Sequence, residues 1–187
     1  MFLRNRFMLL IAAVFLVAGV AVGMSGPAAA APRAATPVAT APTADHVITV
    51  LGAGPYRMGT KLDRLSAAGL IDWVTGPDAA GTQLAGSAAA WSGELMLTFH
   101  HGFLVVVETA TGSVRTAAGA RVGMSFAEVE AIYHGYGKLL TNDQGRTAYL
   151  VPVGPMVLLF GDHPMRPGVG SIQAGPARIL LPAFRNG

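Results

Sequence analysis

The sequence predicts an α+β fold in which two tandem helix–strand modules form a helix layer on one antiparallel sheet. A short pattern of Arg, an apolar residue and Gly occurs at 57–59 and again at 121–123, each time before apolar residues at helical spacing. Each copy is followed by apolar and β-branched segments that turn residues separate, which is typical of strands. The length of 187 residues suits one domain of ordinary size.

The first 31 residues have the pattern of an export signal. Two arginines precede the almost continuously apolar segment 7–22, and the small residues 28–31 follow it. A basic start, an apolar middle and a small-residue cleavage site are the three parts of a secretory signal peptide. We therefore expect residues 1–31 to be removed by cleavage near Ala30 or Ala31, and the alternative is an uncleaved anchor.

The composition of the whole chain owes much to this segment. The chain is 52% hydrophobic with a formal net charge of +3, and its mean hydropathy is +0.48 with a pI of about 9.7. Two of the 13 basic residues lie in 1–31, so the remainder carries a formal charge of +1. No window concentrates Lys and Arg, which argues against nucleic-acid binding. The sequence has no cysteine, so a disulfide and a lipid-modified cysteine are both excluded.

The segment 32–45 is rich in Ala, Pro and Thr and has no large apolar side chains. Such a composition buries too little surface to fold, and we expect a disordered linker. The folded α+β domain is expected at 46–187, with its two repeats at about 46–110 and 111–187.

The first repeat is expected to hold one helix and two strands. Thr60 is the candidate N-cap, and the helix is expected to end near Gly69, a residue that tolerates the left-handed backbone at a helix end. Apolar residues then indicate strands at 94–99 and 103–109, with His100-His101-Gly102 as the tight turn between them.

The second repeat has the clearer helix. Ser125 and Glu128 form a capping box, Val129 belongs to an apolar face with its helical neighbours, and Gly135 ends the helix. Four strands are expected to follow, at 147–153, 156–161, 168–174 and 177–181.

The sequence Val122-Gly123-Met124-Ser125-Phe126-Ala127-Glu128-Val129, closing at Gly135, resembles the helix start of small exported bacterial modules. These are the β-lactamase inhibitory protein-like domains, with two copies of a helix–strand module, and the outer-membrane assembly lipoproteins of the SmpA/BamE type, with one. The resemblance implies a concave antiparallel sheet that binds another protein. It carries over no individual binding residue, and this chain lacks the cysteines of both groups.

Motifs for catalysis or nucleotide binding are incomplete. The glycines at 52–54 resemble a dinucleotide site, but Arg57 stands where the third glycine is needed. Thr60 and Lys61 reverse the order that a P-loop requires, and Ser125 lacks the second glycine of a nucleophile elbow. We therefore predict no catalytic and no cofactor-binding residue.

Four residues are candidates for contact with a partner: Trp73, Trp91, His100 and His101. The two tryptophans flank segment 76–92, which is either a short helix ending near Trp91 or a loop. Large amphipathic side chains are common anchors of binding faces, although burial in the core is their more frequent fate. The adjacent histidines occupy a turn position at the end of a strand.

A metal site is the alternative use of these histidines. His100 or His101 could join Asp162 and His163 across the two repeats. However, adjacent side chains on an extended segment point to opposite faces and ligate one metal poorly. A surface turn is the favoured interpretation, and no metal is predicted.

These observations together predict an exported, non-catalytic binding protein that acts outside the cytoplasmic membrane. Its partner is expected to be an extracellular or envelope protein, with no nucleic acid and, after signal cleavage, no membrane. The alternatives are an extracellular enzyme of unrecognised class and an envelope component anchored to the outer face of the cytoplasmic membrane.

Overall fold

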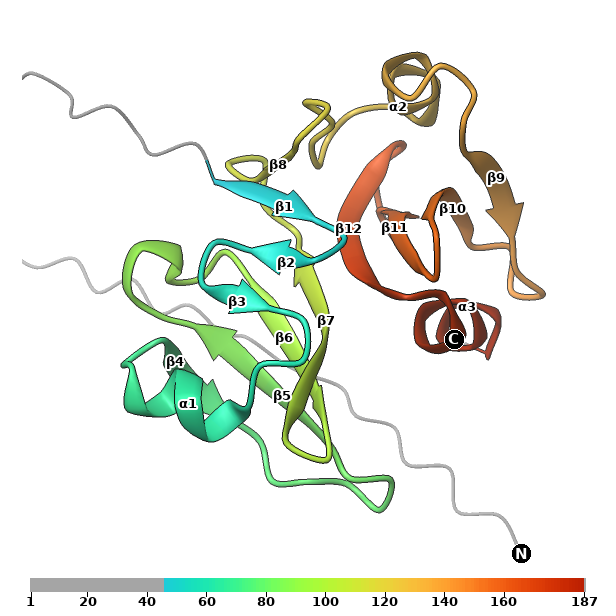
Figure 1. The fold of residues 1–187 in the computed structure, drawn as a ribbon. Helices are drawn as coiled ribbons and strands as arrows, with labels where there is room; N and C mark the ends of the chain where they lie inside the picture. Colours follow the sequence, from blue (N-terminus) through green and yellow to red (C-terminus); the bar gives the residue numbers. More distant parts are fainter. Residues whose placement is uncertain (1–45, 187) are drawn as a thin grey trace, which may run out of the picture. The chain divides into compact units, whose positions relative to one another are not determined.

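The computed structural model describes residues 46–186, which form a mostly β fold of two sheets. Strands make up 42% and helices 18% of it. The α+β fold with a helix layer, expected from the sequence, is therefore wrong. The helices are too short to form a layer, and a second sheet lies where the helix layer was expected (Figure 1).

The smaller sheet has four strands in the order β3-β2-β1-β8. Its strands are β1 (Val47–Thr49), β2 (Gly52–Ala53), β3 (Tyr56–Arg57) and β8 (Arg115–Thr116). Strand β1 pairs antiparallel with β2 but parallel with β8, which joins the start of the domain to its middle. Gly52 begins β2 and Gly54 follows this strand in a turn. The smaller sheet contacts the larger one through β7.

The larger sheet has eight antiparallel strands in the order β4-β5-β6-β7-β12-β11-β10-β9. Its strands are β4 (Ile71–Val74), β5 (Thr82–Ser87), β6 (Met96–His100), β7 (Phe103–Thr109), β9 (Lys138–Thr141), β10 (Thr147–Val153), β11 (Met156–Asp162) and β12 (Val169–Pro176). Two runs of four sequential strands therefore meet at the pairing of β7 with β12, where Glu108 lies opposite Gln173.

Three α-helices and one short 3-10 helix accompany the sheets in the described part of the chain. They are α1 (Leu62–Ala67), η1 (Ala89–Trp91), α2 (Phe126–Ile132) and α3 (Ala177–Asn186). Helix α1 precedes the first run of four strands and α2 precedes the second, while α3 follows β12 (Figure 1).

The capping box of α2 is confirmed. Ser125 Oγ accepts a hydrogen bond from the Glu128 amide at 3.2 Å, and Glu128 Oε2 accepts one from the Ser125 amide at 2.7 Å. The hydrogen bonds that the Glu128 carboxylate accepts from the amide and the hydroxyl of Ser125 hold its pKa below its usual range. The N-cap of α1, in contrast, is Lys61 and not Thr60, and no side chain caps this helix.

Each face of the larger sheet has its own apolar core. On one face, Leu97, Phe99 and Phe160 pack with Ile48 and Tyr56 of the smaller sheet and with residues of α1 and α2. On the other face, a smaller cluster under α3 includes Val106, Leu150, Leu159 and Leu180. Alternation of side chains along each strand separates the two clusters, as a pleated sheet requires.

The strands at 103–109 and 147–153 are confirmed with their predicted bounds. The strand predicted at 177–181 is wrong, because this apolar segment begins helix α3. Segment 76–92 is neither a single helix nor a loop, since it contains strand β5 and then η1.

The predicted signal at 1–31 and linker at 32–45 lie outside the described residues. Within residues 46–186, no helix has both the length and the apolar character needed to span a membrane.

Candidate functional site

One row of paired residues crosses all eight strands of the larger sheet. From β4 to β9 the row is Trp73, Gly86, Met96, Glu108, Gln173, Leu159, Leu150 and Lys138. Directly opposite residues in antiparallel strands place their side chains on the same side of a sheet. The row therefore marks the face that lies opposite the smaller sheet.

Helix α3 covers only part of this face. Leu180 packs with Leu150 and Leu159 of the row, in the half formed by β10 and β11. The other half is left open, because Trp73 is 45% and Met96 is 43% exposed. We call the part of the row formed by Trp73, Met96, Glu108 and Gln173 the open face.

Trp73 and Gly86 fit together at one end of the open face. A Cβ atom on Gly86 would lie only 2.7 Å from Cε2 of the Trp73 indole. The absence of a side chain at Gly86 therefore lets the indole lie against strand β5. Trp73 keeps an exposed surface there and can serve as an aromatic anchor.

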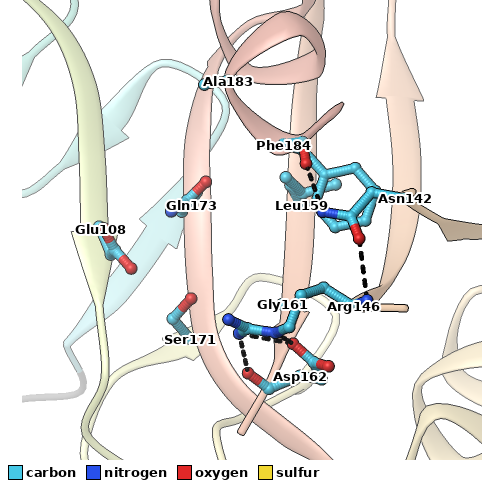
Figure 2. Close-up of a pocket in the computed structure, with 10 residues that line it drawn as sticks. All are labelled: Glu108, Asn142, Arg146, Leu159, Gly161, Asp162, Ser171, Gln173, Ala183 and Phe184. Carbon is cyan, nitrogen blue, oxygen red and sulfur yellow. Dashed lines mark hydrogen bonds and ion pairs between the residues drawn. The ribbon is translucent and has the colours of Figure 1, made fainter. Parts of the chain in front are cut away.

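Two hollows lie side by side along the open face and share Glu108. The first, of about 240 Å³, is lined by Trp73, Gly86, Met96 and Glu108 among others. The second, of about 260 Å³, is lined by Glu108, Gln173 and Phe184 among others, and Figure 2 shows it. The two hollows make one continuous, shallow surface with a carboxylate at its centre.

An ion pair lines the second hollow. Arg146 Nε donates to Asp162 Oδ1 at 2.7 Å, and the Thr147 amide donates to Asp162 Oδ2 at 3.1 Å. Burial raises the pKa of the Asp162 carboxyl, but these hydrogen bonds and the Arg146 charge outweigh burial and lower it. The hydrogen bond to Asp162 in turn raises the pKa of Arg146. The positive charge of Arg146 is thus already matched within the protein (Figure 2).

Asn142 ties helix α3 to the edge of this hollow. Its Nδ2 donates to the Phe184 carbonyl at 2.8 Å, and its Oδ1 accepts from the amides of Gln144 and Arg146. All the polar atoms of this buried side chain are used, so Asn142 fixes where α3 ends on the sheet.

Glu108 differs from these paired groups. Its side chain is half-buried and makes no hydrogen bond or ion pair with any residue in 46–186. In Figure 2 it stands on β7 beside Gln173 of β12, and no dashed line reaches either side chain. Both therefore present unused hydrogen-bonding groups on the open face.

A second polar cluster lies near the start of the domain. Glu94 accepts a hydrogen bond from the Ser113 hydroxyl at 2.9 Å and also contacts His46 Nδ1, while the His46 ring stacks on Trp91 at 4.0 Å. The carboxylate stands between the hydroxyl and the imidazole. His46 therefore does not take the proton of Ser113, as a serine nucleophile would need.

The structure places the four predicted partner-binding residues differently. Trp73 is on the open face, but Trp91 is only 8% exposed and belongs to the core. His100 and His101 lie at the tip of the β6–β7 hairpin, four and five positions along the chain from Met96. The structure thus brings only one of the four to the open face.

The histidine pair lies at the surface turn that the sequence favoured, although the two rings lie close together and do not point to opposite faces. His101 has a φ of 50° in the turn, and its ring lies 4.1 Å from that of His100, centroid to centroid. Asp162 is paired with Arg146, and His163 lies within 3.2 Å of Arg166. Across residues 46–186, no three His, Cys, Asp or Glu side chains are grouped so that they could hold a metal ion.

Sequence reasoning missed Glu108 and Gln173. Glu108 follows five apolar residues of β7, and Gln173 lies between Ile172 and Ala174 of β12. Such isolated polar residues carry no motif. The departure of Glu108 from the apolar run 103–107 is the one local signal that could have drawn attention to it.

Comparisons with family models, with curated proteins and with solved structures gave no match to this chain.

Proposed function

We propose that the protein is an exported, non-catalytic binding protein that acts outside the cytoplasmic membrane and recognises another protein with its open face. The proposal of export depends on the pattern of residues 1–31. The observation that carries the proposal of binding is the open face itself, where exposed Trp73 and Met96 adjoin Glu108 and Gln173, which have no partner in 46–186.

The composition of the open face favours a protein partner. Trp and Met are enriched at protein interfaces, and a tryptophan beside a shallow hollow is a frequent anchor of binding energy. The hollows are small and joined along a row of strands, so they suit successive side chains of a polypeptide better than one enclosed small molecule.

A capture experiment with matched variants tests this function. The purified protein is immobilised and exposed to culture fluid and envelope extract, alongside its Trp73→Ser and Tyr136→Ser variants. Tyr136 is a suitable control because it is an aromatic residue with 69% exposure outside the open face. We expect a protein that the wild type and Tyr136→Ser retain and Trp73→Ser loses. A retained protein that is indifferent to Trp73→Ser would contradict the proposed face.

The proposed export is tested separately by mass spectrometry of the native N-terminus. A mature protein that begins near Pro32 is expected from the signal pattern. An intact Met1 segment on the native protein would refute cleavage and favour the anchored form.

A further inference from the structure

The charges around the first hollow are unbalanced. Three carboxylates, those of Asp72, Glu94 and Glu108, line it, and no Lys or Arg does. Glu94 is engaged with His46 and Ser113, whereas Glu108 has no partner in the part of the chain that the structure describes. A half-buried carboxylate is poorly hydrated, so it gains more from a cationic partner than a fully exposed one does.

The arginine that lines the second hollow does not neutralise Glu108. Arg146 lines the second hollow together with Glu108, but both its Nε and its Nη2 lie 2.7 Å from Asp162 Oδ1. Its hydrogen bonds are therefore made to Asp162 and not to Glu108 (Figure 2). Glu108 therefore has no compensating charge within residues 46–186, and it lies at the point where the two hollows meet.

The apolar residues of the same hollow indicate which cationic group of a partner would fit beside Glu108. Trp73 offers an exposed indole and Met96 an exposed thioether chain, one on each side of Gly86 in the row. A planar guanidinium can stack on an indole and at the same time donate two parallel hydrogen bonds to a carboxylate. The compact ammonium of a lysine does neither as well.

On these grounds we infer that the open face binds a polypeptide partner through an arginine side chain that lies between Trp73 and Glu108. The Glu108 carboxylate accepts hydrogen bonds from the guanidinium, Trp73 and Met96 contact its flat faces and aliphatic stem, and Gln173 bonds to the partner's backbone. The partner is a polypeptide and not a small cation, because the face continues past the hollow to Gln173. This inference rests on the proposed function and specifies the chemistry of the partner.

The test is an NMR titration of the ¹⁵N-labelled protein. The probes are the capped peptide Ac-Leu-Arg-Leu-NH₂, the same peptide with citrulline in place of arginine, and ethylguanidinium alone. Citrulline keeps the shape of arginine and removes its charge. The protein has two tryptophans, so the indole N–H signals of exposed Trp73 and buried Trp91 report on the open face and on the core respectively.

We expect the arginine peptide to shift the Trp73 signal in a saturable way and to leave the Trp91 signal in place. The citrulline peptide and ethylguanidinium should each bind at least about tenfold more weakly. Glu108→Gln should remove the preference for arginine, and Glu130→Gln should keep it. Glu130 is the matched control, being an exposed acid on α2.

The contrary outcomes separate the two proposals. Equal binding of the arginine and citrulline peptides at Trp73 would overturn the inference that the face recognises arginine. The proposal that the open face is a binding surface would then still stand. A preference for arginine that survives Glu108→Gln would also overturn the inference. If ethylguanidinium bound with the same affinity as the peptide, the ligand would be a small cation and not a polypeptide. A titration in which the arginine peptide moves no signal near Trp73 would reject the arginine site, while the capture experiment would still decide on the face.

Discussion

Trp73 lies against the bare backbone of Gly86 on the neighbouring strand, and a Cβ atom at Gly86 would stand 2.7 Å from Cε2 of its indole. This contact holds the indole against strand β5. The position of the aromatic anchor is therefore set by the absence of a side chain one strand away.

Replacing Gly86 with Ala should displace the Trp73 indole and weaken binding at the open face. The backbone of Gly86 is outside the left-handed region, so alanine meets no conformational barrier there. Because the indole is exposed and can move, we expect the free energy of unfolding to change by less than about 1 kcal/mol. The shift of the Trp73 indole N–H signal and the affinity for the arginine peptide are the measurements.

Gly76→Ala is the control for this change, since a Cβ there meets nothing within 4 Å. If Gly86→Ala left the Trp73 signal where it is in the wild type, the close packing of the two residues would be disproved.

The buried side chain of Asn142 should be required for helix α3 to dock on the sheet. In Asn142→Asp the donor to the Phe184 carbonyl is lost, and a carboxylate oxygen then faces that carbonyl. An unsatisfied buried polar group costs about 1–3 kcal/mol, and more when it is charged. We expect faster amide hydrogen exchange across Ala177–Asn186 than in the control Asn186→Asp, whose exposed side chain allows the same chemical change. Unchanged exchange in α3 would argue against this anchoring role.

The capping box at the start of α2 predicts a measurable loss on Ser125→Ala. Ser125 Oγ accepts a hydrogen bond from the Glu128 amide, and without this oxygen the amide can bond only to water. N-cap substitutions of this kind cost about 1 kcal/mol, and urea unfolding should show this difference. Ser92→Ala is a matched change at an exposed serine whose hydroxyl makes no hydrogen bond within 46–186, and it should leave stability unchanged. An equal effect of the two substitutions would mean that the box does not stabilise the helix.

The sequence predicted those elements whose signal is local. Strands 103–109 and 147–153 are rich in apolar and β-branched residues. The capping box of Ser125 and Glu128 indicates the start of α2. Segment 177–181 failed because a short apolar run is equally consistent with a strand and a buried helix. The helix is favoured by its packing on the apolar surface of the sheet that includes Leu150 and Leu159, and this contact is not visible in the local sequence.

The rest of the fold and most of the candidate site depend on pairing between distant segments. Strand β5 (Thr82–Ser87) has little strand propensity and is held between β4 and β6 by register. Trp73 was a candidate because tryptophan is informative wherever it occurs. Glu108 departs from the apolar run 103–107, but its position between Met96 and Gln173 follows from strand order, which a single sequence does not show.

The Arg146–Asp162 pair predicts how stability depends on pH. The pKa of Asp162 is lowered in the folded protein, so its ionised form stabilises the fold at pH values above the ordinary pKa of about 3.9. This contribution is lost as the pH falls through the lower, folded pKa. Since both side chains are partly solvated, we expect Asp162→Asn to cost only about 1 kcal/mol at pH 7 and less at pH 3. Urea unfolding at the two pH values measures the difference, with Asp143→Asn, an exposed acid in the turn between β9 and β10, as the control. A cost that is the same at both pH values would show that Asp162 acts through packing and not through its charge.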